Sequence, residues 1–267
     1  MYESHWGLQE SPFRGVANAR YFYSSPTHEE ALARLHFLLE NKRQLGLLLG
    51  GAGSGKSLVL EVFARQLKAA GSHVVSLSLL ALDEREFLWE LASQLHRNPR
   101  DSDNSFQLWR SITDRLSENR YQQLPTVLLL DDAEEATPKV LGHLMRLLHQ
   151  DSSLQSPLTM VMAADPVKVG QLGRRVLEMS ELRIELETWD PEDTLDYIAA
   201  SLAKAGNSGQ VFDPNAASRV HELTQGVPRK VCNLAELALV AGAGRQLTTI
   251  DVATIDAVYE ELAWILR

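Results

Sequence analysis

One stretch of the chain constrains the fold more than any other. Residues 45–50, Leu-Gly-Leu-Leu-Leu-Gly, read as a short apolar strand, and residues 50–55 form a glycine-rich turn. A helix is predicted to follow directly, from about Ser57 to Ala70. Such a strand–turn–helix unit can aim several backbone N–H groups at one point, because glycines place no Cβ atoms in the way.

The same turn carries the residue types that hold a chain of phosphates. Gly50, Gly55, Lys56 and Ser57 satisfy the Walker A pattern G-x-x-x-x-G-K-[ST]. The helix N-terminus adds partial positive charge, Lys56 is expected to reach the outer phosphates, and the Ser57 hydroxyl is expected to bind Mg²⁺. The alternative is a strand-to-helix turn without a ligand, and the motif in this context favours nucleotide binding. The predicted nucleotide-binding residues of the loop are Gly50, Gly51, Ala52, Gly53, Ser54, Gly55, Lys56, Ser57 and Leu58.

A second chemical signal follows 74 residues after the first, where residues 126–132 read Thr-Val-Leu-Leu-Leu-Asp-Asp. An apolar run that ends in an acid predicts a buried strand with a carboxylate at its C-terminal end, where open α/β sheets bind ligands. Asp131 is therefore predicted to bind Mg²⁺ as a Walker B acid, and Asp132 to orient the attacking water. Glu134 and Glu135 are close enough in sequence to compete for that second role, and the alternative for all three is a solvated acidic turn.

A further strand is predicted at residues 158–165, and it again ends in a polar residue. Asp165 is placed to contact the γ-phosphate water or Mg²⁺, or simply to begin a turn with Pro166. Arg174 and Arg175 follow, as an arginine finger for a neighbouring subunit or as a solvated basic spot. An alternating strand at residues 182–186 ends this part of the chain.

The periodicity then changes, and only helices are predicted after about residue 190. We expect an N-terminal extended arm at 1–27, an α/β core at 28–188 and a helical lid at 189–267. Aromatic residues of the arm, such as Trp6, Phe13 and Tyr21, are expected to anchor a core or to line an adenine pocket. Arg229 begins one of the lid helices, either as a surface residue or as a contact to bound phosphates.

Composition narrows the class of protein. The formal net charge of −9, from 26 basic and 35 acidic residues, argues against a broadly basic nucleic-acid-binding surface. The single cysteine, Cys232, excludes an internal disulfide framework and is expected to be a buried, inert thiol. No long apolar run or signal-like N-terminus is present, so we expect no membrane segment and a cytoplasmic location.

The order of these signals resembles the AAA+ ATPases of the general secretion pathway protein A (ExeA) type, which are related to TnsC- and TniB-like transposition ATPases. The likeness covers nearly the whole chain. Its most specific parts are the opening Trp6-Gly7-Leu8 with Pro12-Phe13, and Gly226-Val227-Pro228-Arg229, which matches the sensor 2 segment with Arg229 as the sensing arginine. Asp165 stands in the sensor 1 region.

The resemblance implies an α/β P-loop NTPase core with a five-stranded parallel sheet, followed by a smaller all-helical AAA+ lid. It also implies a homo-oligomer with ATP at the subunit interfaces, and a partner that responds to the nucleotide state. Three departures stand out: Asp132 replaces the usual Walker B Glu, Asp165 replaces a Gln, and the Gln-Arg that supplies a trans arginine falls at Glu178-Met179. Arg174, Arg175 or Arg183 would have to substitute. The secretion-type relatives continue into a membrane segment and a cell-wall-binding region, so this chain is a stand-alone form or part of a longer protein.

The leading prediction is a Mg²⁺-dependent ATPase that couples ATP binding and slow hydrolysis to oligomerisation and to a partner protein. Lys56, Asp131, Asp132 and Arg229 are the predicted catalytic residues, and Ser57 and Asp131 the metal ligands. One alternative is an ATP-binding switch with little hydrolysis, because Asp132 is one methylene shorter than Glu. The other is an ATP-dependent DNA-binding regulator of the transposition type. The basic clusters Arg174-Arg175 and Arg229-Lys230-Arg245 favour it, and the net charge of −9 counts against it.

Overall fold

The computed structural model describes residues 2–13, 22–150 and 158–266. The chain forms two compact units. The sheet unit comprises residues 28–52 and 56–186, and the helical unit comprises residues 1–27, 53–55 and 187–267. Tyr21, an aromatic residue of the predicted arm, lies outside the described residues.

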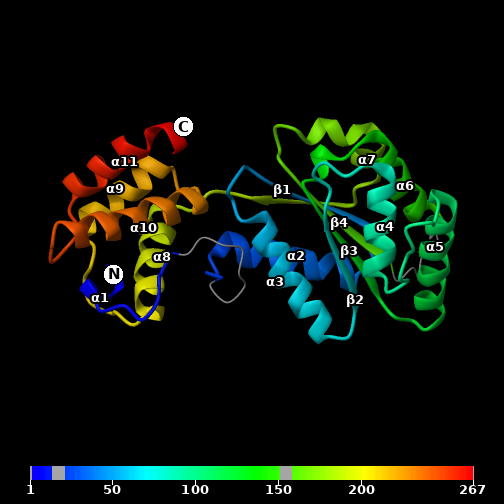
Figure 1. The fold of residues 1–267 in the computed structure, drawn as a ribbon, viewed down its shortest axis with the longest axis horizontal. Coiled ribbons are helices and arrows are strands. Elements are labelled where there is room, and N and C mark those ends of the chain that lie inside the picture. Colours follow the sequence, from blue (N-terminus) through cyan, green and yellow to red (C-terminus); the bar gives the residue numbers. More distant parts are fainter. Residues whose placement is uncertain (1, 14–21, 151–157, 267) are drawn as a thin grey trace. The chain divides into compact units, whose positions relative to one another are not determined.

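The sheet unit is built on five parallel strands in the order β2-β3-β4-β1-β5, which confirms the predicted five-stranded parallel sheet (Figure 1). Parallel strands place all their C-terminal ends at one edge of the sheet. The strands are β1 (Leu45–Gly50), β2 (His73–Ser78), β3 (Thr126–Asp131), β4 (Leu158–Ala164) and β5 (Leu182–Leu186).

Burial follows the position of each strand in the sheet. All residues of β1 and β4 are buried, whereas the edge strands β2 and β5 alternate between buried and exposed positions. This difference is expected, because helices cover both faces of the central strands of a parallel sheet. The continuous apolar runs that identified the strands in the sequence are therefore the central strands themselves.

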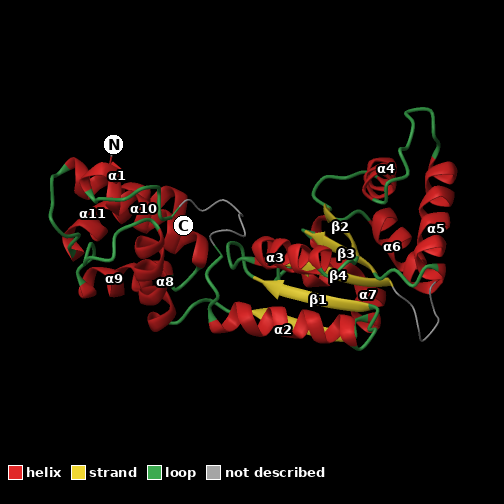
Figure 2. Ribbon diagram, turned by 90° about the horizontal axis from the view of Figure 1, so that it is seen from below, coloured by secondary structure: helices red, strands yellow, loops and turns green. Residues whose placement is uncertain are grey.

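Helices cover the two faces of the sheet. Figures 1 and 2 show α2 (Pro26–Glu40) and α3 (Lys56–Ala69) on one face. Four helices cover the other face (Figure 1). Their buried side chains form one apolar core with Leu45, Leu47 and Leu49 of β1. These four helices are α4 (Glu84–Gln94), α5 (Ser105–Tyr121), α6 (Pro138–Gln150) and α7 (Gly173–Met179). Two short 3-10 helices, η2 (Ala133–Glu135) and η3 (Val169–Leu172), follow β3 and β4.

The helical unit has a separate apolar core. It contains α1 (Tyr2–His5), α8 (Pro191–Lys204), α9 (Pro214–Thr224), α10 (Pro228–Gly244) and α11 (Val252–Leu266). The start of the chain belongs to this unit: α1 forms in the stretch that we expected to be extended, and Trp6 and Phe13 are buried in the core. The Trp6 Nε1–H donates to Leu239 O at 2.9 Å, so the N-terminal residues are held against α10.

Candidate functional site

The glycine-rich turn connects β1 to α3 as the sequence predicted. Gly53 and Gly55 have φ values of +81° and +100°, in the left-handed region that residues with a Cβ seldom adopt. Gly51 shows no such requirement, because a Cβ atom added there would meet open space. Within the turn, Gly53 and Gly55 are therefore the glycines that the backbone itself requires.

Lys56 is the first residue of α3 and turns back over the loop. Its Nζ donates hydrogen bonds to Gly50 O at 2.7 Å and to Gly51 O at 3.3 Å. Ser57 follows it and is exposed, in the first turn of the helix, where the N–H groups give partial positive charge. A flexible ammonium group, a hydroxyl and a helix N-terminus thus lie together directly after β1.

A cavity of about 400 Å³ brings Ser57 together with the end of β3. Asp131, the last residue of β3, and Ser78, the last residue of β2, line it with Ser57. Ser78 and Asp131 are register partners in the parallel ladder, so the two strands end at the same level. Residues that are 74 positions apart in sequence therefore bring a hydroxyl and a carboxylate to one cavity.

Asp132 turns toward β2. Its backbone is left-handed (φ 51°, ψ 40°), and its Oδ2 accepts a hydrogen bond from Ser78 Oγ at 2.8 Å. Sequence reasoning missed Ser78. The available signal was a polar residue at the C-terminal end of an adjacent strand, but the strand order was needed to interpret it.

Asp165 follows β4 immediately. Its Oδ1 accepts the N–H of Val167 at 2.8 Å, so the carboxylate stabilises the turn that Asp165-Pro166 begins. The N–H of Asp165 donates to Glu134 Oε1 at 3.1 Å. Of the two interpretations of Asp165, the turn is directly visible in these bonds.

Arg229 lies in the first turn of α10, in the helical unit, and is exposed. Three residues before it, Gly226 has φ +66°, and its carbonyl accepts the N–H of Trp189 at 3.0 Å. A Cβ atom at Gly226 would lie only 2.0 Å from Trp189 O. The glycine of the Gly-x-Pro-Arg segment is therefore required by the backbone of the helical unit.

The arginines that we considered as trans arginines have partners within the sheet unit. Arg174 Nε pairs with Glu178 at 2.6 Å, Arg175 Nη2 donates to His149 Nε2 at 2.6 Å, and Arg183 Nε pairs with Glu185 at 3.0 Å. The side chain of Arg174 is nevertheless 90% exposed, so this pair adds little stability and can exchange.

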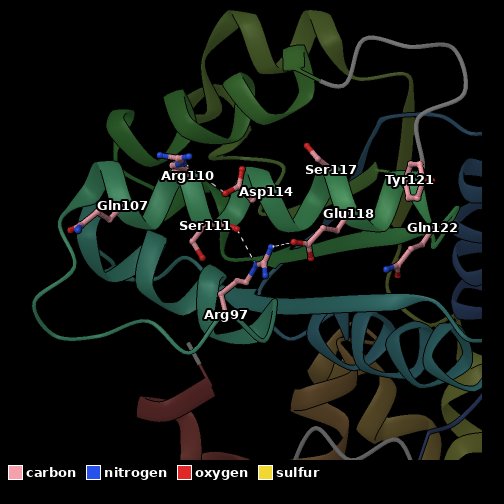
Figure 3. Close-up of a pocket in the computed structure, with 9 residues that line it drawn as sticks. All are labelled: Arg97, Gln107, Arg110, Ser111, Asp114, Ser117, Glu118, Tyr121 and Gln122. Carbon is pink, nitrogen blue, oxygen red and sulfur yellow. Dashed lines mark hydrogen bonds and ion pairs between the residues drawn. The ribbon is translucent and has the colours of Figure 1, made fainter.

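A larger hollow, of about 820 Å³, lies along α5 (Figure 3). Arg97 reaches into it, donating from Nη2 to Glu118 Oε1 at 2.5 Å and from Nε to Ser111 O at 3.3 Å. The hollow is lined by polar and charged residues, and none of the predicted phosphate-binding or metal-binding residues is among them. The smaller cavity at Ser57 and Asp131 is therefore the candidate site.

Comparison with known proteins agrees with this arrangement. Residues 39–169 match the family described as AAA domain. This match includes the loop, Lys56, Ser57 and Asp131, and it ends just after Asp165.

The chain is also 29% identical over 250 residues to general secretion pathway protein A from Aeromonas hydrophila, which confirms the resemblance found in the sequence. The alignment covers 92% of this chain and 45% of the relative, so the chain spans less than half of that protein's length.

Solved structures show the same fold. The Aeropyrum pernix ORC1 protein in complex with DNA has a TM-score of 0.72 at 17% identity and covers 96% of this chain and 69% of its own. Drosophila ORC bound to DNA has a TM-score of 0.74 at 14% identity, covering 96% and 65%. The Thermotoga maritima RuvB Holliday junction branch migration motor has a TM-score of 0.62 at 16% identity, covering 94% and 73%. Within the described part of the chain, no helix has the length and apolar character needed to cross a membrane.

Proposed function

We propose that this chain binds ATP with Mg²⁺ and hydrolyses it. The observation that carries the proposal is the cavity shared by Ser57 and Asp131 beside the glycine-rich turn, where the Lys56 ammonium group lies 2.7 Å from Gly50 O. The AAA domain match over residues 39–169 supports the same activity.

Each residue of the site has a defined role in this proposal. The loop N–H groups and Lys56 bind the phosphates, and Ser57 and Asp131 provide the hydroxyl and carboxylate oxygens that Mg²⁺ prefers. The bound ion would neutralise charge on the β- and γ-phosphates. Arg229, exposed at the start of α10, is the proposed arginine of the helical unit that senses the phosphates.

Hydrolysis also requires a carboxylate that orients water for attack on the γ-phosphorus. The sequence predicted Asp132 for this role. A positioned general base contributes about 10²–10⁴-fold to such a rate, so the placement of this carboxylate decides how fast the enzyme works.

Nucleotide binding is tested by replacing Lys56. We expect Lys56→Ala to weaken ATP binding at least tenfold in a fluorescent-nucleotide titration, because the phosphates lose their nearest cation. Lys68→Ala is the matched control. Lys68 lines the same cavity but lies near the C-terminal end of α3, whereas Lys56 begins that helix. Equal affinities for the two variants would refute the site.

We further propose that ATP drives self-association and that a partner protein reads the assembled state. The likeness to general secretion pathway protein A supports a role of this kind. Light scattering after size exclusion, with ATP or without nucleotide, tests it, and an unchanged mass rejects it. A cytoplasmic location, where ATP and Mg²⁺ are available, stays a prediction.

An ATP-binding switch with little hydrolysis is the first alternative. The hydrogen bond between Ser78 and Asp132 favours it, because it holds the predicted water-orienting carboxylate on β2. Steady-state phosphate release distinguishes the two functions, and a rate no higher than that of Asp131→Asn favours the switch.

DNA binding is the second alternative, and one surface favours it. Helix α6 has no acidic residue, and Lys139, Arg146 and His149 are exposed on it, with Lys139 paired to Glu84 at 3.2 Å. Two proteins of similar fold, Aeropyrum pernix ORC1 and Drosophila ORC, are bound to DNA in their solved structures. Retention of the ATP-loaded chain on duplex DNA, falling steeply with salt, would support this function, and no retention at low salt would exclude it.

One of the basic clusters predicted from the sequence does not exist. Arg229 and Lys230 lie in the first turn of α10, and Arg245 caps its C-terminal end. At 1.5 Å per residue these ends are about 24 Å apart along the helix axis, because a continuous helix separates residues that the sequence pattern grouped.

A further inference from the structure

Strand β2 forms one edge of the sheet (Figure 2). It pairs with β3 on one side only, with Ser78 in register with Asp131. The N–H and C=O groups of Ser76 point away from β3, and because these groups alternate along a strand, those of Val74 and Ser78 do so too. An edge of this kind is a template on which another chain can add a strand.

The sequence of β2 makes this edge prone to pairing. Residues 74–80 read Val-Val-Ser-Leu-Ser-Leu-Leu, without a charged residue, a proline or a glycine. Uncharged segments of β-branched and apolar residues are the ones that associate through exposed strands. The opposite edge differs, because β5 exposes Arg183 and Glu185, and charged side chains are a common protection of sheet edges. Strand β2 therefore needs protection of another kind.

Helix α4 supplies this protection through its last residue, Gln94. The Ser76 N–H donates to Gln94 Oε1 at 3.0 Å, and Gln94 Nε2 donates to Ser76 O at 2.8 Å. The carboxamide thus presents one donor and one acceptor to β2, as the backbone of a neighbouring strand would. A single side chain therefore satisfies both outward groups at the middle of the edge.

The same two groups are those that a second copy of β2 requires. In an antiparallel ladder, the two residues of a hydrogen-bonded pair exchange both N–H···O bonds. If the β2 strands of two chains met about a two-fold axis at Ser76, the two Ser76 residues would exchange both bonds, and Val74 would face Ser78. This pairing and the Gln94 contact exclude each other, because Ser76 has only one backbone N–H to donate.

We infer that Gln94 protects the sheet edge: its carboxamide occupies the backbone groups through which β2 would add the β2 strand of a second chain. This inference goes beyond the proposed function and does not depend on nucleotide. It does concern the same region, since Ser76 and Ser78 also line the cavity with Ser57 and Asp131. A strand added at β2 would therefore border that cavity.

The test compares two substitutions that remove the same two hydrogen bonds. Gln94→Ala leaves the edge uncovered, whereas Gln94→Lys places a charge beside it. Without nucleotide, we expect Gln94→Ala to show about twice the mass of the parent chain in sedimentation velocity at high concentration, and the parent mass on dilution. Gln94→Lys should keep the parent mass throughout. Gln94→Ala combined with Ser76→Pro should do so too, because proline removes the Ser76 N–H.

The lysine variant separates an uncovered edge from a destabilised fold, because both variants lose the same bonds. The inference is overturned if Gln94→Ala keeps the parent mass at every concentration, or if the two variants associate equally. Hydrogen exchange in the parent chain gives a second measurement that needs no variant to fold. The Ser76 amide should exchange at least about 100-fold more slowly than in an unfolded peptide, and exchange near the unfolded rate would show that Gln94 does not cover the edge.

Discussion

Replacing Gly226 with alanine tests how the helical unit is held together. Gly226 follows α9 with φ +66°, and a Cβ atom there would lie 2.0 Å from Trp189 O and 2.9 Å from Trp189 C. Because an ordinary contact to Cβ is at least 3.4 Å, the Trp189 peptide would have to move by more than 1 Å. That movement would also break the bond from Trp189 N–H to Gly226 O.

The expected cost is the sum of these effects. A left-handed backbone costs a residue with a Cβ about 1–2 kcal/mol, and the lost hydrogen bond about 0.5–1.5 kcal/mol. With residual steric strain, we expect Gly226→Ala to lower the free energy of unfolding by about 3 kcal/mol. For a unit of this size, that corresponds to a fall in Tm of about 12–24 °C.

Circular dichroism during thermal and urea unfolding measures this cost. The matched control is Gly244→Ala at the end of α10, where a Cβ atom meets open space and φ is not positive. Alanine there should be neutral or stabilise by up to about 1 kcal/mol. Comparisons of this kind carry an error of roughly a few tenths of a kcal/mol. If the free energies of unfolding of the two variants differ by less than about 0.5 kcal/mol, the steric argument is wrong.

Three further predictions concern buried polar groups. Burial raises the pKa of the Cys232 thiol, which also contacts Tyr197 Oη at 2.9 Å, so a thiol reagent at pH 7.5 should react quickly only in the unfolded chain; rapid native labelling would contradict this. Asn119→Ala should cost about 2 kcal/mol in urea unfolding, because the buried amide donates to Thr126 Oγ1 at 2.9 Å; a loss below the measurement error would count against the bond. Burial lowers the pKa of His73, so the native state binds this proton less readily than the unfolded chain does. Stability should therefore fall as the pH drops below about 6.5, and His73→Gln should reduce the fall between pH 7.5 and 5.5; an identical fall in both proteins would exclude His73 as its source.

The local parts of the fold could be predicted from the sequence. Continuous apolar runs indicated β1, β3 and β4, because strands buried on both faces have no polar side. The glycine-rich turn was predictable because its chemistry lies in consecutive residues: Gly53 and Gly55 do have left-handed backbones. Helix α7 was missed, since seven residues carry too little periodicity to identify a helix.

The sequence by itself determined that a phosphate-binding loop and an acid at the end of a strand occur in one chain, because each is a local pattern. Only the tertiary structure decided which side chains meet. Strand order places Asp132 beside Ser78 on β2 and Glu134 beside Asp165 after β4. Packing within the helical unit buries Trp6 against Leu239. These contacts join residues up to 233 positions apart, and they depend on packing and on one left-handed residue, which spacing along the chain does not encode.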